Sequence, residues 1–139
     1  MRVIFDSNVF VSAAIQSGAS HRLIQGWFLT RSPELIACQQ LLDEVDEVLM
    51  RRRRMRKWLS EVEAEEFLGV VQQLIEVKDD PTEVAPYLRD SADDYLIALA
   101  HEYAVQYIVS GDKDLLEWDL QEPPVTTPAS FEILQRLVP

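Results

Sequence analysis

Short runs of hydrophobic residues alternate along this chain with longer stretches in which hydrophobic residues recur three and four positions apart. Short runs bounded by turn-forming residues are typical of buried parallel strands, and the longer pattern predicts helices. The predicted strands are residues 2–6, 34–37, 75–77, 107–110 and a short edge strand at Val125. The predicted helices are residues 8–15, 21–30, 39–52, 60–74, 92–103, 114–117 and 129–137. Strands that alternate with helices predict an α/β fold whose parallel sheet carries helices on both faces.

Acidic residues stand where two of the predicted strands end. Asp6 follows Val3-Ile4-Phe5, and Asp112 follows Ile108-Val109-Ser110-Gly111. Open α/β sheets bind ligands at the carboxyl ends of their strands. Carboxylates that gather there repel one another unless a cation neutralises them. The sequence therefore predicts a divalent metal site at this edge of the sheet.

Most of these acids also have an ordinary structural interpretation. Asp6 could cap the helix that follows it, although Ser7 and Asn8 would serve equally well. Glu44 lies on a helix with several neighbouring acids, most of which must be solvated surface. The stretch 112–114 could be a simple turn stabilised by its aspartates. Each acid alone is a moderate signal, and their combination is the stronger one.

Asp93 and Asp94 open the predicted helix over 92–103, for which either Asp90 or Ser91 is the expected cap. Acids in a first helical turn are stabilised by the helix dipole, which is the structural interpretation. On a regular helix Asp94 shares the inward face with residues three and four positions later. Asp93 is then turned about 100° away, so we expect it to face solvent.

The net charge of −11 excludes binding of polyanions by general attraction. The basic residues are nevertheless concentrated, since six of the 13 Lys and Arg lie within residues 51–57, beginning with Arg51, Arg52, Arg53 and Arg54. This run is either a basic patch that guides a phosphate backbone or a solvated helix end favoured by the dipole.

Other features exclude whole classes of protein. The single cysteine, Cys38, cannot form an internal disulfide, and no cluster of Cys and His predicts a zinc site. No apolar stretch approaches the roughly 18 residues that span a bilayer. Residues 1–2 lead directly into a strand rather than a signal peptide, so we expect a soluble, cytoplasmic protein.

Four segments together resemble the PIN-domain family of metal-dependent ribonucleases, and within it the small toxin-like members. They are 3–9, Glu44, 89–100 and 107–116, and the last two, in order and at this spacing, are the specific ones. The resemblance covers essentially the whole chain. It implies one domain over 1–139, a three-layer α/β/α sandwich with a central parallel sheet of four or five strands.

The resemblance also implies the site. Its core acids are Asp6, Glu44, Asp94 and Asp112, of which Asp6, Asp94 and Asp112 hold Mg²⁺ or Mn²⁺. Asp94 is preferred over its neighbours because the family's acid precedes an Ile-Ala step at this distance. Supporting positions are Asn8, Asp93, Ser110 and Asp114.

The implied activity is hydrolysis of RNA phosphodiester bonds, and the implied partners are RNA, an antitoxin protein that blocks the site, and a second copy of the chain. Arg51 to Arg54 would then clamp RNA or meet acidic antitoxin residues. We expect Trp27, Phe28, Trp58 and Phe67 mostly to build the core; any that are exposed would mark a groove for a partner helix.

Two alternatives remain. The segment 4–9 also looks like the nucleophile strand of a haloacid-dehalogenase-type phosphatase, although that family usually has a second Asp where Asn8 stands. The chain could also be a catalytically inactive module that binds RNA or protein.

Overall fold

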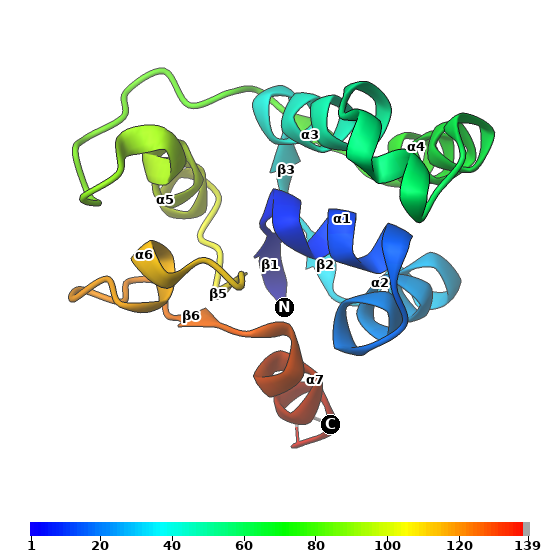
Figure 1. Ribbon diagram of the computed structural model, residues 1–139. Coiled ribbons are helices and arrows are strands. Elements are labelled where there is room, and N and C mark those ends of the chain that lie inside the picture. The colour runs from blue at the N-terminus through cyan, green and yellow to red at the C-terminus, as the bar shows by residue number, and fades with distance from the viewer. Residues whose placement is uncertain (138–139) are drawn as a thin grey trace.

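A computed structural model describes residues 1–137 and shows a parallel β-sheet flanked by helices (Figure 1). The main sheet has four strands in the order β2-β1-β5-β6, and a second, two-stranded parallel ladder joins β3 and β4. The strands are β1 (Arg2–Phe5), β2 (Glu34–Leu35), β3 (Ala37–Cys38), β4 (Val77–Lys78), β5 (Tyr107–Val109) and β6 (Val125–Thr126). The predicted α/β architecture with a central parallel sheet is confirmed.

Within residues 1–137, seven α-helices connect or follow these strands. They are α1 (Ser7–Ile15), α2 (Ala19–Thr30), α3 (Gln39–Asp46), α4 (Glu61–Leu74), α5 (Asp94–Glu102), α6 (Lys113–Leu116) and α7 (Pro128–Leu137). Three short helical turns lie between them, a π-helical turn at Glu47–Arg51 and 3₁₀ turns at Arg53–Lys57 and Ser91–Asp93. Among residues 1–137, no helix is both long and apolar enough to cross a bilayer.

The central strands are the most buried part of the molecule. In β1, Val3, Ile4 and Phe5 are at most 1% exposed, because the strand lies between β2 and β5 and is covered on both faces. Phe5 pairs with Val109 across the β1–β5 ladder, so the two strands end side by side. The residues that directly follow them therefore emerge at the same edge of the sheet.

Helices cover both faces of this sheet. Figure 1 shows α2 and α7 on one side and α5 on the other. On the first side the Phe5 ring lies 6.1 Å from the rings of both Phe10 in α1 and Phe131 in α7. On the other side, α5 is buried continuously from Asp94 to Ala100. Side chains alternate between faces along a strand, so Asp6, one residue after Phe5, points to the α5 side.

The strand predicted at 34–37 and the helix predicted at 39–52 both differ from the structure. The strand expected at 34–37 is split, since β2 pairs with β1 and β3 pairs with β4. The helix expected at 39–52 changes to a π-helical turn after Asp46, and the Arg56 side chain donates to the Leu49 carbonyl there. Ser60 and Glu63 form a capping box at the start of α4.

Candidate metal centre

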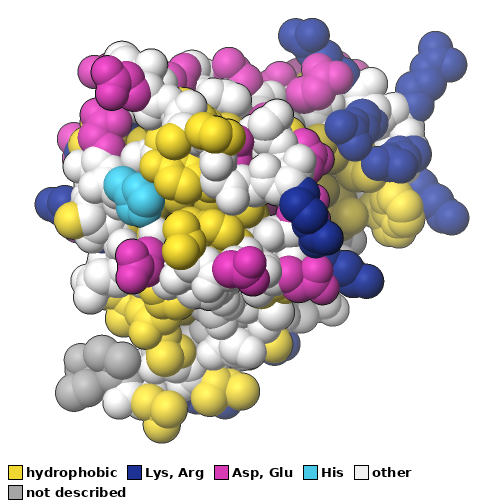
Figure 2. Space-filling view, turned by 90° about the vertical axis from the view of Figure 1, so that its left-hand side faces the viewer, with side chains coloured by type: hydrophobic (Ala, Val, Ile, Leu, Met, Phe, Trp, Pro, Cys, Tyr) yellow, Lys and Arg dark blue, Asp and Glu magenta, His cyan; other side chains and the backbone are white. Residues whose placement is uncertain are grey.

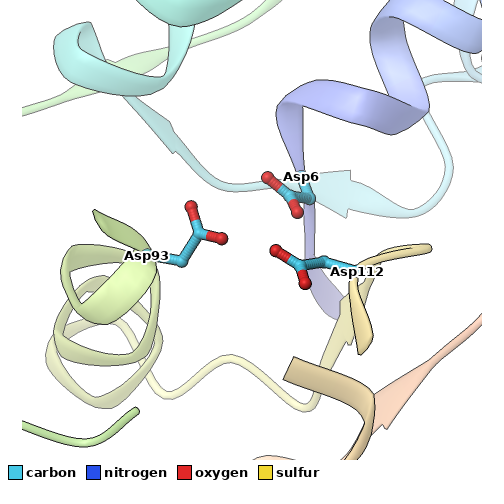
Figure 3. A group of neighbouring side chains, drawn as sticks. All are labelled: Asp6, Asp93 and Asp112. Atoms are coloured by element: carbon cyan, nitrogen blue, oxygen red, sulfur yellow. The ribbon is translucent and has the colours of Figure 1, made fainter. Parts of the chain in front are cut away.

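Three carboxylates from separate elements meet at the carboxyl edge of the sheet (Figure 3). Asp6 follows β1, Asp112 follows β5, and Asp93 directly precedes α5. One carboxylate oxygen of each lies within 4.8 Å of those of the other two. Asp6 and Asp112 are neighbours because their strands are, and α5, packed on the same face, brings Asp93 to them.

Asp6 is the most firmly held of the three acids. It is 2% exposed, and its Oδ2 accepts hydrogen bonds from the Ser110 hydroxyl at 2.7 Å and the Asn8 side-chain amide at 3.0 Å. Its Oδ1 accepts the backbone N–H of Ser7 at 2.7 Å. Asp6 is therefore also the N-cap of α1, so its structural and its site-forming interpretations both apply.

Ser110 and Asn8 connect the ends of β1 and β5. The Ser110 hydroxyl oxygen accepts the Asp112 backbone N–H at 2.9 Å while it donates to Asp6. The Asn8 side-chain oxygen accepts the Gly111 backbone N–H at 3.3 Å. These bonds hold the loop after β5 against Asp6.

Asp94 is buried, as its predicted inward orientation requires, but Asp93 does not face solvent as expected. Residues Ser91–Asp93 form a 3₁₀ turn, and Asp93 is the N-cap of α5, with φ −105° and ψ 7°. The 100° rotation of a regular helix therefore does not relate the two side chains, and Asp93 points to Asp6 and Asp112 instead of to solvent (Figure 3).

Asp94 is buried elsewhere and is not one of the three grouped acids. It is 3% exposed, and its Oδ1 accepts the backbone N–H groups of Tyr87 at 3.2 Å and Leu88 at 2.9 Å. The carboxylate thus anchors the segment that precedes α5. This contact gives Asp94 a structural role.

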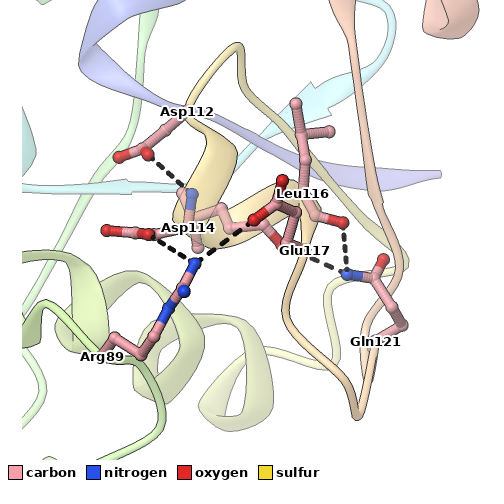
Figure 4. Close-up of polar contacts among 7 residues, drawn as sticks. Arg89, Asp112, Asp114, Leu116, Glu117 and Gln121 are labelled. Atoms are coloured by element: carbon pink, nitrogen blue, oxygen red, sulfur yellow. Dashed lines mark hydrogen bonds and ion pairs between the residues drawn. The ribbon is translucent and has the colours of Figure 1, made fainter.

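Asp114 supports the centre through its backbone. Its N–H donates to Asp112 Oδ1 at 2.9 Å, while its own Oδ1 lies 3.2 Å from Nη2 of Arg89 (Figure 4). Arg89 Nη2 is also 3.2 Å from Oε2 of Glu117. The Asp114 carboxylate is therefore paired with Arg89, and its backbone holds Asp112 in place.

Glu44 lies beside the three acids. Its neighbour is Tyr95, a residue that was not predicted from the sequence to belong to the site. Burial, with the charge of Asp6 in addition, raises the pKa of Glu44. Tyr95 is 3% exposed, and its hydroxyl has no hydrogen-bond partner within residues 1–137. Burial first, and then the Glu44 charge, raises the pKa of this hydroxyl. The only sequence signal for Tyr95 was a hydroxyl in an otherwise aliphatic run.

The grouped acids perturb one another. Burial, followed by the charges of Asp6 and Asp112, raises the pKa of Asp93 to about 8. Burial also raises the pKa of Asp6, and the charge of Asp112 adds to this, whereas the hydrogen bonds from Ser110 and Ser7 oppose it. Without a cation, the group therefore retains a proton near neutral pH.

The donor set fits a hard divalent cation. All three side chains offer carboxylate oxygen, the ligand type that Mg²⁺ and Mn²⁺ prefer, and neither His nor Cys belongs to the group. A bound cation replaces the proton that Asp93 otherwise keeps. The residues present therefore fit a divalent metal ion, which Asp6, Asp93 and Asp112 could hold.

A groove of about 990 Å³ leads away from this centre. Its walls combine acids with the start of the arginine run. The lining residues are Ser7, Gln40, Asp43, Glu44, Asp46, Glu47, Val48, Arg51, Arg52, Asp80, Ala92 and Asp93. Arg51, Arg52, Arg53 and Arg54 are all exposed. Figure 2 shows basic side chains gathered toward one end of the molecule, beside acidic side chains.

A family model described as the PIN domain matches residues 2–114, and the chain therefore belongs to the PIN-domain family. No curated protein matches the chain. PIN domains are generally nucleases that act on RNA and typically use divalent metals. The match spans Asp6, Glu44, Asp93 and Asp112, and the acidic group at the sheet edge is suited to hold such a metal.

Replacing Asp94 with Ala should destabilise the fold, because two backbone N–H groups would be left without their acceptor. We expect a decrease of about 1–3 kcal/mol in the free energy of unfolding, measured by urea denaturation. Asp94→Asn keeps an acceptor oxygen, so its free energy of unfolding should fall less. Asp119→Asn, on the exposed surface, should leave the free energy of unfolding unchanged. An Asp94→Ala protein as stable as wild type would contradict this role.

The metal-free protein should become less stable as the pH rises from about 4 to about 8. In this range folded Asp93 keeps its proton, since its pKa is about 8, whereas the unfolded chain releases it near 3.8. Unfolding then releases a proton, and rising pH favours it. Urea unfolding in EDTA should show a shallower decline for Asp93→Asn than for wild type; identical slopes would refute the raised pKa.

Proposed function

We propose that this protein is a metal-dependent endoribonuclease that hydrolyses RNA phosphodiester bonds with Mg²⁺ or Mn²⁺ held by Asp6, Asp93 and Asp112. The observation that carries the proposal is the meeting of these three carboxylates, within 4.8 Å, at the sheet edge of a PIN domain. Asp93 takes the place that was expected for Asp94.

The chemistry follows from the positions of the side chains. A divalent cation at this centre supplies Lewis-acid activation of water and stabilises charge on the scissile phosphate. Asp6 provides a fixed carboxylate, because Ser110, Asn8 and Ser7 hold both of its oxygens. Glu44, at the groove wall beside Asp6, is placed to orient the attacking water. The resemblance to PIN ribonucleases implies products with a 5′-phosphate and a 3′-hydroxyl.

The uneven distribution of charge over the surface explains how an acidic protein can bind RNA. The carboxylates repel phosphate until cations neutralise them, so metal is required for the scissile phosphate to bind at the acidic centre as well as for catalysis. Arg52, Arg53 and Arg54 form no ion pair within residues 1–137, whereas Arg51 lies 3.5 Å from Glu47. The arginine run can therefore attract the backbone of an RNA strand whose other part lies in the groove.

Metal-dependent cleavage of labelled single-stranded RNA tests the proposal. We expect cutting with Mg²⁺ or Mn²⁺ that EDTA abolishes and that Asp93→Asn reduces by about 100-fold or more, because a ligand matters at least as much as the outer groups around it. Asp94→Asn, the matched control at the neighbouring position, should keep most of the activity.

The other outcomes separate the alternatives. Activity abolished by Asp94→Asn but kept with Asp93→Asn would contradict the assignment of the third ligand. Hydrolysis of a small phosphate ester, without RNA cleavage, would favour the phosphatase interpretation. Binding of RNA without any cleavage would favour an inactive binding module.

Neutralising the arginine run should weaken RNA binding and flatten its salt dependence. For a single strand, the slope of log K against log salt changes by about 0.7 for each phosphate that the protein neutralises. Replacing Arg51 to Arg54 with Gln should therefore reduce the slope measured by fluorescence anisotropy, whereas Arg136→Gln in α7 should not. Equal slopes for both variants would show that the arginine run is not part of the RNA-binding surface.

We also propose that residues 1–139 form one domain that acts in the cytoplasm as the toxin of a toxin–antitoxin pair. The support is the resemblance to the small toxin-like PIN proteins, in which an antitoxin blocks the site and dimers are frequent. The acidic groove offers charges to which an inhibitory segment can bind, and the arginine run offers the opposite sign.

A further inference from the structure

One tryptophan lies on the surface, although its sequence pattern predicted a place mainly in the core. Trp58 is 52% exposed, whereas Trp27 and Trp118 are 3% and 7% exposed. It follows the 3₁₀ turn Arg53–Lys57, and its backbone N–H donates to the Met55 carbonyl at 3.0 Å. Met55 and Leu59 are buried and fix this turn to the body of the protein. The backbone that carries the exposed indole is therefore held in a defined position.

The surroundings of Trp58 are cationic. Nζ of Lys57 lies 5.5 Å from the centre of its ring, and Arg53 and Arg54 are exposed in the same turn. Neither arginine forms an ion pair within residues 1–137, in a chain whose net charge is −11. Unpaired cations beside an exposed aromatic ring match a ligand that has both anionic groups and flat apolar faces.

A single-stranded nucleic acid has this composition. Its phosphates pair with arginine and lysine, and its unpaired bases stack on aromatic rings. In a duplex the bases are stacked within the helix and cannot reach a side chain on the surface. The alternative occupant is a partner helix. Such a helix binds through its apolar face, so it does not account for several unpaired cations around the ring.

We propose that Trp58 stacks against an unpaired base of a single-stranded RNA substrate while Arg53 and Arg54 contact the adjoining phosphates. The inference rests on the proposed function for the identity of the substrate and adds that the substrate is unpaired at this point. The groove is lined by Asp93 at the acidic centre and by Arg51 and Arg52, which directly precede this turn in the chain.

Tryptophan fluorescence tests the stacking directly, because only Trp58 of the three indoles is open to a base. The titration uses the full chain in EDTA, which prevents cleavage, at low salt, with a 12-nucleotide uridylate RNA and a 12-base-pair RNA duplex. We expect the single strand to quench the emission and the duplex to quench it much less.

Two substitutions identify the residue and the type of interaction. Trp58→Ala should bind the single strand about 5-fold or more weakly, measured by anisotropy, because one base can no longer stack. Trp58→Phe retains a ring and should keep most of the affinity while losing the quenching. Circular dichroism of each variant checks the fold, which an exposed side chain should leave intact.

The remaining outcomes either contradict the stacking proposal or separate it from the proposed nuclease activity. Unchanged emission on binding RNA, or wild-type affinity for Trp58→Ala, would exclude stacking. Emission that shifts with protein concentration in the absence of RNA would assign this surface to a second copy. Quenching without metal-dependent cleavage would contradict only the nuclease, and cleavage with unaltered affinity in Trp58→Ala would contradict only the stacking.

Discussion

Repulsion among three carboxylates governs how this protein is built around its site. Asp6, Asp93 and Asp112 hold oxygens within 4.8 Å of one another, and burial strengthens the repulsion that water would otherwise screen. The protein tolerates this arrangement by two means. Asp6 receives hydrogen bonds on both oxygens, and Asp93 has a pKa of about 8, so that it keeps its proton until a cation arrives. Such an arrangement opposes folding and favours the binding of metal.

The pairing of strands in the sheet places Asp6 and Asp112 side by side. The β1–β5 ladder pairs Phe5 with Val109, which brings the ends of two buried strands together. Ser110 then joins Asp6 to the Asp112 backbone, and the packing of buried α5 holds Asp93 against the same edge. A change in strand register would move Asp112 away from Asp6. The hydrophobic core therefore supplies the free energy that keeps like charges close.

Much of this could be predicted from the sequence. Strands ending in Asp6 and Asp112 followed from hydrophobic runs, and parallel pairing makes their ends meet. Which of Asp93 and Asp94 lies beside Asp6 and Asp112 could not be predicted, because it depends on a 3₁₀ turn at Ser91–Asp93 where a regular helix was expected. The contact that fixes Asp94 comes from Tyr87 and Leu88, whose path the local pattern does not determine. The exposure of Trp58 likewise depends on a turn anchored by Met55 and Leu59, and an aromatic residue carries no such information alone.

Calorimetric titration with Mn²⁺ is the sharpest test of this metal centre, because it needs neither a substrate nor catalysis. We predict that the wild-type protein binds Mn²⁺, that Asp93→Asn binds it at least 10-fold more weakly, and that Asp94→Asn binds it as wild type does. Proton release on binding should accompany the wild-type reaction near neutral pH, since the cation displaces the proton of Asp93. Equal binding by wild type and Asp93→Asn, or binding abolished only by Asp94→Asn, would contradict the assignment of the metal centre.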